Sequence, residues 1–115
     1  MATEEPKSPI LQGTLDLMVL TTLHSMGPMH GYGIARRIEQ VSEDRIALNQ
    51  GTIYAALLRL QQKHWISAGW GVSENKRRAK FYSITPAGER QLEAEARNWD
   101  RMASVMGRLL AAVRG

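Results

Sequence analysis

The stretch from Asn49 to Thr85 decides the fold: it reads NQGTIYAALLRLQQKHWISAGWGVSENKRRAKFYSIT. Its first part has the period of a helix, because Ile53, Leu57 and Leu60 fall at positions i, i+4 and i+7. Two segments with alternating apolar residues follow, and the polar run SENKRRAK separates them. A helix that leads into a β-hairpin is the order of a recognition helix and its wing. The stretch therefore predicts a mainly α fold in which a small β-hairpin follows the recognition helix.

The predicted hairpin shows the two-residue period of strands that have one covered face. On the first strand, 65–72, the residues on one side are Ile66, Ala68, Trp70 and Val72. On the second strand, from Lys80 onward, Tyr82 and Ile84 alternate with Phe81 and Ser83 in the same way.

The predicted recognition helix has one polar face. Asn49 is a good N-cap, because its side chain can accept a hydrogen bond from an unpaired amide two or three residues on. The polar face carries Gln50, Thr52, Tyr54, Arg59, Gln62 and Lys63. Amides, hydroxyls and cations suit base edges and phosphates in a major groove. An ordinary solvated helix could carry the same residues, but fewer such helices would show Tyr and Thr outward beside two cations.

The positive charge is concentrated at one end of this helix and in the hairpin turn. The whole chain has a net charge of +4, yet the segment from Arg59 to Lys80 holds six cations against Glu74 alone. The residues assigned to the wing are Asn75, Lys76, Arg77, Arg78 and Lys80. Most charge runs are solvated loops, but this one falls at a hairpin tip, where a wing meets phosphates. We therefore expect double-stranded DNA as the partner.

Two helices are predicted before this stretch. The first, from about Ile10 to Met26, is apolar on two sides and should be buried on both. Gly27 and Pro28 end it, because proline cannot continue the hydrogen-bond ladder. The second helix covers 31–41, and its inward residues are Ile34, Ile38 and Val41.

The segment from Pro86 to Val113 has the clearest helical period. Thr85 and Pro86 form a strong start signal, with threonine as the cap and proline at the first helical position. Apolar residues then repeat in alternating steps of four and three, as in a coiled-coil seam. The seam consists of Leu92, Ala96, Trp99, Ala103, Met106, Leu110 and Val113. A seam needs a partner, so we expect a homodimer interface; the alternative is that the helix folds back on its own domain.

Composition excludes several classes of protein. A chain of 115 residues with 43% hydrophobic residues is typical of one folded domain. The absence of cysteine excludes disulfides, iron–sulfur clusters and cysteine-zinc sites. The N-terminus is unlike a secretory signal, and no apolar run is long enough to span a bilayer. We therefore expect a cytoplasmic protein without a membrane partner.

Catalytic patterns are also missing. His24, His30 and His64 fall in separate segments, with no paired metal-ligand spacing and no serine elbow. His30 precedes a predicted helix and could cap it. The run HGYGIA is too incomplete for a nucleotide-phosphate loop. We expect no enzyme activity, no metal and no cofactor.

Four segments together resemble the PadR family of bacterial transcriptional regulators, in particular its short-tailed members with a single C-terminal helix. They are LQGTLDLMVLTTL, HGYGIARRIEQ, GTIYAALLRLQQKHWI and KFYSITPAGERQL. The resemblance implies a homodimer built on the C-terminal helix and repression of nearby genes through a partly palindromic operator. It assigns Tyr54 to the family's characteristic recognition-helix tyrosine. Gln50 and Ala55 depart from the family, whose members often have proline at both places, so the operator sequence cannot be copied from relatives.

The polar N-terminus, with its two prolines, predicts a flexible arm at 1–9. The resemblance implies a winged helix-turn-helix DNA-binding domain at 10–85 and a dimerisation helix at 86–115. It also implies a small aromatic or multidrug-like effector at the dimer interface. Trp99 lies on the seam with methionines nearby, which suit irregular apolar ligands. The candidate pocket comprises Leu11, Leu15, Met18, Trp99, Met102 and Met106. The alternative is that these residues are core contacts, as aromatics and methionines at helical spacing more often are.

One alternative function stays open at this point. A winged helix can bind another protein or RNA without operator specificity, because the fold alone does not decide the partner.

Overall fold

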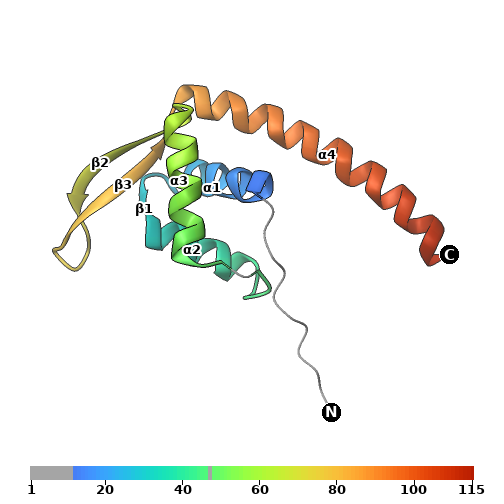
Figure 1. Cartoon of the computed structure of the whole chain (residues 1–115), viewed down its shortest axis with the longest axis horizontal. Helices are drawn as coiled ribbons and strands as arrows, with labels where there is room; N and C mark the ends of the chain where they lie inside the picture. Colours follow the sequence, from blue (N-terminus) through green and yellow to red (C-terminus); the bar gives the residue numbers. More distant parts are fainter. Residues whose placement is uncertain (1–11, 47) are drawn as a thin grey trace, which may run out of the picture.

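The computed structural model describes residues 12–46 and 48–115. The elements in chain order are α1 (Gln12–Met26), β1 (Met29–His30), α2 (Gly31–Val41), α3 (Gln50–Gln62), β2 (Ile66–Val72), β3 (Arg78–Ile84) and α4 (Pro86–Arg114) (Figure 1). The predicted fold class, a mainly helical winged helix-turn-helix with a long C-terminal helix, is confirmed. The arm predicted at 1–9 and the start of the first helix near Ile10 lie outside the described residues.

The sheet has one strand more than the predicted hairpin. Its order is β1-β3-β2, and both pairings are antiparallel. The short strand β1 pairs Met29 with Tyr82 and His30 with Phe81. Two residues are too few to show a period, so β1 left no signal in the sequence. The following helix, α2, begins with the predicted cap, since His30 Nδ1 accepts a hydrogen bond of 3.0 Å from the Gly33 amide.

The core lies between α1, α2, α3 and the base of the hairpin. Its buried members are Leu15, Val19, Leu20, Leu23, Ile34, Ala35, Ile38, Ile53, Ala56, Leu57, Leu60, Ile66 and Tyr82. The inward positions predicted for α3 and for most of α2 are confirmed. Val41 is a correction, because it is the last residue of α2 and is 69% exposed.

Helix α4 begins at the hairpin base and then leaves the domain. Thr85 Oγ1 accepts from the Gly88 amide at 3.0 Å and donates to the His64 carbonyl oxygen at 2.7 Å, so the predicted cap is confirmed. The first turns of α4 lie beside α1, where His24 Nδ1 is 2.7 Å from Glu89 Oε2. The C-terminal half projects away from the other elements (Figure 1). None of the helices in the described part of the chain combines the length and the apolar character needed to span a membrane.

Candidate nucleic-acid interface

The N-terminal end of α3 is fixed by its cap. Asn49 Oδ1 accepts from the Thr52 amide at 2.8 Å and from the Thr52 hydroxyl at 3.0 Å. This satisfies an amide that the helix itself leaves unpaired. The neighbouring Gln50 is exposed at the first helical position. Gln50 is therefore open to solvent, whereas the Thr52 hydroxyl is already engaged in a hydrogen bond within the protein.

Tyr54 lies one turn further along α3 and is 47% exposed. Its ring covers Gly31, where an added Cβ atom would approach the ring to 3.0 Å. The lack of a side chain at position 31 therefore makes room for Tyr54 over the start of α2. Behind it lies Tyr82, whose hydroxyl has a pKa raised by burial and, to a smaller extent, by the proximity of Tyr54. Tyr82 is only 5% exposed and belongs to the core.

The tip of the hairpin is a turn closed by its own hydrogen bonds. The Ser73 amide donates to the Arg77 carbonyl oxygen at 2.8 Å, and the Lys76 amide donates to the Ser73 carbonyl oxygen at 2.9 Å. Lys76 has a left-handed backbone with φ of 58°, which turns the chain back. The residues predicted for the wing, Asn75, Lys76, Arg77, Arg78 and Lys80, are all exposed.

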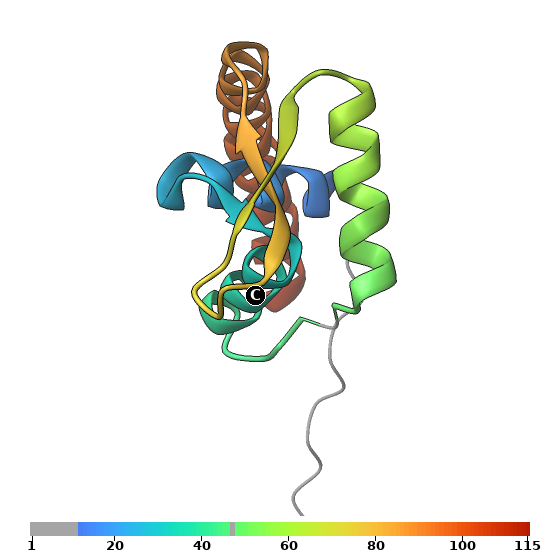
Figure 2. The ribbon, with the colours of Figure 1, turned by 90° about the vertical axis from the view of Figure 1, so that its left-hand side faces the viewer.

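A hollow of about 560 Å³ joins α3 to the hairpin. Figure 2 shows the hairpin tip and the N-terminal end of α3 at the same end of the molecule, with α2 between them. The hollow is lined by Tyr54 from α3, by Tyr32 from α2 and by Arg77, Arg78 and Lys80 from the hairpin. The structure therefore brings the recognition-helix tyrosine and the wing cations around one concave surface. We call this surface the helix–wing hollow.

Arg59 has a different place from the one predicted for it. Its Nη2 atom donates to Asp16 Oδ1 of α1 at 2.7 Å, and the two side chains are 26% and 13% exposed. Each partner of this largely buried ion pair fixes the other in place, because removal of either one would leave an unpaired charge in the protein. Arg59 therefore joins α3 to α1 and is not free on the polar face.

Gln62 and Lys63 also lie apart from the hollow. They end α3 near the base of the hairpin, roughly 18 Å along the helix axis from Gln50. The Lys63 ammonium is 4.8 Å from the centroid of the Trp65 ring. The structure thus separates these residues from the N-terminal end of α3 and from the wing tip.

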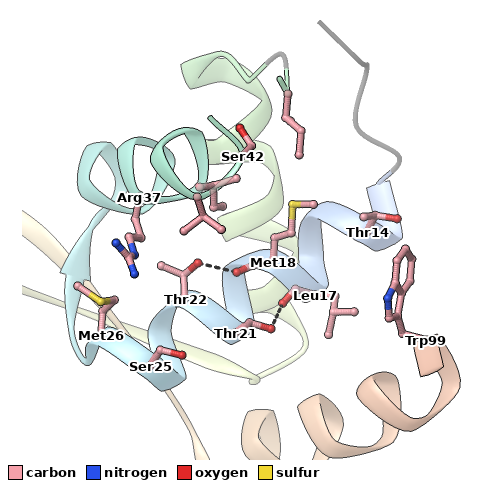
Figure 3. A pocket seen from close by; sticks show the side chains of 13 residues that line it. Thr14, Leu17, Met18, Thr21, Thr22, Ser25, Met26, Arg37, Ser42 and Trp99 are labelled. Atoms are coloured by element: carbon pink, nitrogen blue, oxygen red, sulfur yellow. Dashed lines mark hydrogen bonds between the residues drawn. The ribbon is translucent and has the colours of Figure 1, made fainter. Parts of the chain in front are cut away.

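A second concave surface lies between α1, α2 and α4, with a volume of about 410 Å³ (Figure 3). Met18 lies in its wall, Arg37 lies at one end and Trp99 at the other. Hydroxyl groups line the α1 side, but Thr21 and Thr22 donate theirs to backbone carbonyl oxygens one turn back. The surface is therefore mainly apolar, with a cation and an indole at its two ends.

The groove contains Met18 and Trp99 of the predicted ligand pocket but not its other described members. Leu15 is 1% exposed and belongs to the core, so its side chain does not line the groove. Met102 and Trp99 line a separate hollow beside Gly13. Met106 is half exposed further along α4, and Leu11 lies outside the described residues. The sequence missed the α2 side of the groove, including Arg37, because nothing local links α2 to Trp99.

Solved structures share this architecture. A PadR-like transcriptional regulator from Bacillus cereus strain ATCC 14579 is 27% identical, with a TM-score of 0.75 over 87% of this chain and 94% of that chain. A PadR family transcription regulator from hypervirulent Clostridium difficile R20291 is 31% identical, with a TM-score of 0.72 over 84% of this chain and 97% of that chain. Most of this chain therefore shares its architecture with these regulators.

Curated relatives differ in length. An uncharacterized 37.1 kDa protein in transposon TN4556 of Streptomyces fradiae is 41% identical over 87 residues, which are 76% of this chain but 23% of that protein. Uncharacterized protein X of Lysinibacillus sphaericus is 26% identical over 100 residues, 87% of this chain and 91% of that protein. The chain thus spans about a quarter of the first relative and most of the second.

The sequence model of the transcriptional regulator PadR-like family matches residues 19–94. The match begins in α1, includes α2, α3 and the whole hairpin, and ends in the first third of α4. It therefore contains every residue of the helix–wing hollow. This chain belongs to the PadR-like family of transcriptional regulators, which are not enzymes.

Proposed function

We propose that this chain is a cytoplasmic, sequence-specific DNA-binding regulator that acts as a homodimer and represses nearby genes through a partly palindromic operator. The observation that carries the proposal is the helix–wing hollow, where Tyr54 faces Arg77, Arg78 and Lys80 across one concave surface. In such an arrangement the recognition helix can contact base edges in the major groove while the basic hairpin contacts the flanking phosphates.

The roles within the interface follow from chemistry. Gln50 can pair with the edge of adenine through its amide, and Tyr54 contributes a hydroxyl at the same end of the helix. The wing cations contact phosphates, which fix the register of the protein without reading sequence. We leave Arg59 out of this set, because Asp16 holds it. Gln62 and Lys63 are left out as well, because they lie at the far end of α3.

The homodimer is proposed from the exposed seam of α4. Leu92 packs against the protomer's own core, whereas Trp99, Met106 and Leu110 are 52%, 50% and 37% exposed. Because apolar residues with a heptad spacing remain uncovered in the protomer, a second copy of the same helix is the partner that fits them. In this arrangement 10–85 binds DNA and 86–115 joins the protomers. Two recognition helices would then lie about one DNA turn apart, roughly 34–36 Å.

The wing gives the first prediction. Arg77→Gln and Arg78→Gln should each weaken binding to operator and shuffled DNA alike, because each removes a cation from a phosphate. The slope of log affinity against log salt should fall by about 0.9 for each phosphate that is no longer neutralised. Anisotropy titrations at several salt concentrations measure this. Gln50→Ala should instead narrow the gap between operator and shuffled DNA and leave the slope unchanged.

The same experiment separates the alternative function. For a module that binds another protein or RNA, we expect no contact between these arginines and the phosphates of duplex DNA. Unchanged salt slopes in both arginine variants would count against the proposed phosphate contacts. If Gln50→Ala weakened every DNA equally, Gln50 would not be a base-reading residue.

An effector site is the second part of the proposal. The groove of Met18, Arg37 and Trp99 has a volume of about 410 Å³, within the roughly 300–1,000 Å³ of small-molecule pockets. A flat aromatic ligand could stack on the Trp99 indole. It would release DNA only if it bound the DNA-free arrangement of the dimer more tightly than the DNA-bound one.

The prediction for this groove uses acridine orange as the probe, without DNA. The dye should quench tryptophan fluorescence of the unmodified protein by stacking on Trp99. Trp99→Ala should lose most of that quenching while the protein stays dimeric in size-exclusion chromatography with light scattering. Equal quenching of the variant would remove Trp99 from the site.

A further inference from the structure

One face of the hairpin carries an exposed tryptophan. At the hairpin base this face enters the core through Ile66 and Tyr82, which are 2% and 5% exposed. Alternation along the ladder places Trp70, opposite Lys80, on the same face nearer the tip. The core no longer covers it there, and Trp70 is 63% exposed. A ring this open adds little to the stability of its own domain.

Arg78 lies over this ring. The carbon of its guanidinium group is 4.7 Å from the centroid of Trp70. Arg78 pairs with Val72, two residues beyond Trp70 on the ladder, so the two side chains are diagonal neighbours on one face. Both line the helix–wing hollow. Among the described residues, no carboxylate lies within ion-pair distance of Arg78.

A guanidinium group on an aromatic face keeps its N–H donors available at its edge. An unsupported arginine has many rotamers and loses that freedom when it binds a phosphate. A side chain that is already held in place loses less, and the difference strengthens binding. The stacking of Arg78 on Trp70 therefore reduces the ordering that a phosphate contact requires.

We propose that Trp70 is a positioning residue for DNA binding: its ring holds the Arg78 guanidinium group at the helix–wing hollow, preset for a backbone phosphate. The inference rests on the proposed function. It assigns Trp70 a role through Arg78 and no DNA contact of its own. It also explains why an indole stands uncovered on the inner face of a basic hairpin.

A double-mutant cycle tests the proposal. Affinity for labelled DNA from upstream of the gene is measured for the unmodified protein, Trp70→Leu, Arg78→Gln and the double variant. Trp70→Leu should weaken binding about two- to fivefold when Arg78 is present. It should weaken binding by less than about 1.5-fold in the Arg78→Gln background, because the two residues act as one unit. Trp70→Phe keeps an aromatic face and should recover most of the loss.

The chain offers a matched control at the other end of the hairpin. Lys63 lies over Trp65 at 4.8 Å, and Lys63→Gln removes the same charge as Arg78→Gln. It should weaken binding less than Arg78→Gln and leave the effect of Trp70→Leu unchanged. Thermal unfolding followed by circular dichroism should show the same midpoint for Trp70→Leu and the unmodified protein, since the ring is exposed.

The outcomes separate the two proposals. An equal loss from Trp70→Leu in both Arg78 backgrounds would show that Trp70 acts independently and would overturn the inference. No loss in either background would overturn it too. If in either case the unmodified protein still preferred upstream DNA over a shuffled fragment, the proposed function would stand. If the unmodified protein had no such preference, the proposed function would fail and the inference with it.

Discussion

Met106→Glu is expected to separate the proposed homodimer into monomers and to weaken binding to the proposed operator by roughly 100-fold or more. Met106 lies on the exposed seam of α4 and is 50% exposed in the protomer. In the proposed dimer its side chain faces a second copy, so a carboxylate there would be buried without a partner. Separate protomers lose the advantage of two linked half-site contacts, which is why the expected effect on DNA binding is large.

Sedimentation velocity and anisotropy titration measure the two effects of Met106→Glu. The matched control is Ser104→Glu, which adds a negative charge to α4 at an exposed position outside the seam and should keep both dimer and affinity. A dimer that survives Met106→Glu would show that α4 does not join the protomers through this seam. Monomers that bind the operator as tightly as the dimer would separate dimerisation from DNA binding.

Gly88→Ala is expected to destabilise the fold by about 3 kcal/mol or more, at the upper end of the cost of overpacking. A Cβ atom at position 88 would lie 2.0 Å from the Trp65 carbonyl oxygen and 2.8 Å from Ile84 Cγ1. The obstacle is backbone, and the Trp65 oxygen also accepts the Thr85 amide at 3.0 Å. Relief of the clash therefore requires α4 to move away from the hairpin base.

Urea denaturation at fixed protein concentration measures this loss through the free energy of unfolding. The control is Gly69→Ala in β2, where an added Cβ atom meets nothing within 4 Å. That change should be neutral or should stabilise by up to about 1 kcal/mol, because glycine in a strand costs chain entropy. A Gly88→Ala protein as stable as the unmodified one would contradict the close docking of α4 on the hairpin.

The parts of the fold that could be predicted from the sequence depend on residues close together in the chain. Asn49 and Thr85 were predictable as caps because each bonds an amide three residues on. The core face of α3 was predictable because helical period fixes which side chains share a side. Strand β1 was not, since its partner β3 is about 50 residues away and two residues show no period.

The candidate site was likewise predictable only where it depends on residues close together in the chain. Pattern and charge indicate the wing cations and Tyr54, whereas their meeting around one hollow depends on the packing of α2 between them. Helical period alone puts Arg59 on the polar face. Its ion pair could not be predicted, because the partner, Asp16, lies 43 residues earlier on α1. Alternation predicts a covered strand face for Trp70, but the core ends before it and leaves it exposed.

The most direct test of sequence-specific DNA binding is an anisotropy titration of the unmodified protein into labelled DNA from immediately upstream of its gene, beside a shuffled fragment of equal length, at two salt concentrations. We predict at least about tenfold tighter binding to the upstream DNA, with both affinities falling as salt rises. Equal affinity for the two fragments, or no binding to either, would contradict sequence-specific recognition of this DNA through the helix–wing hollow.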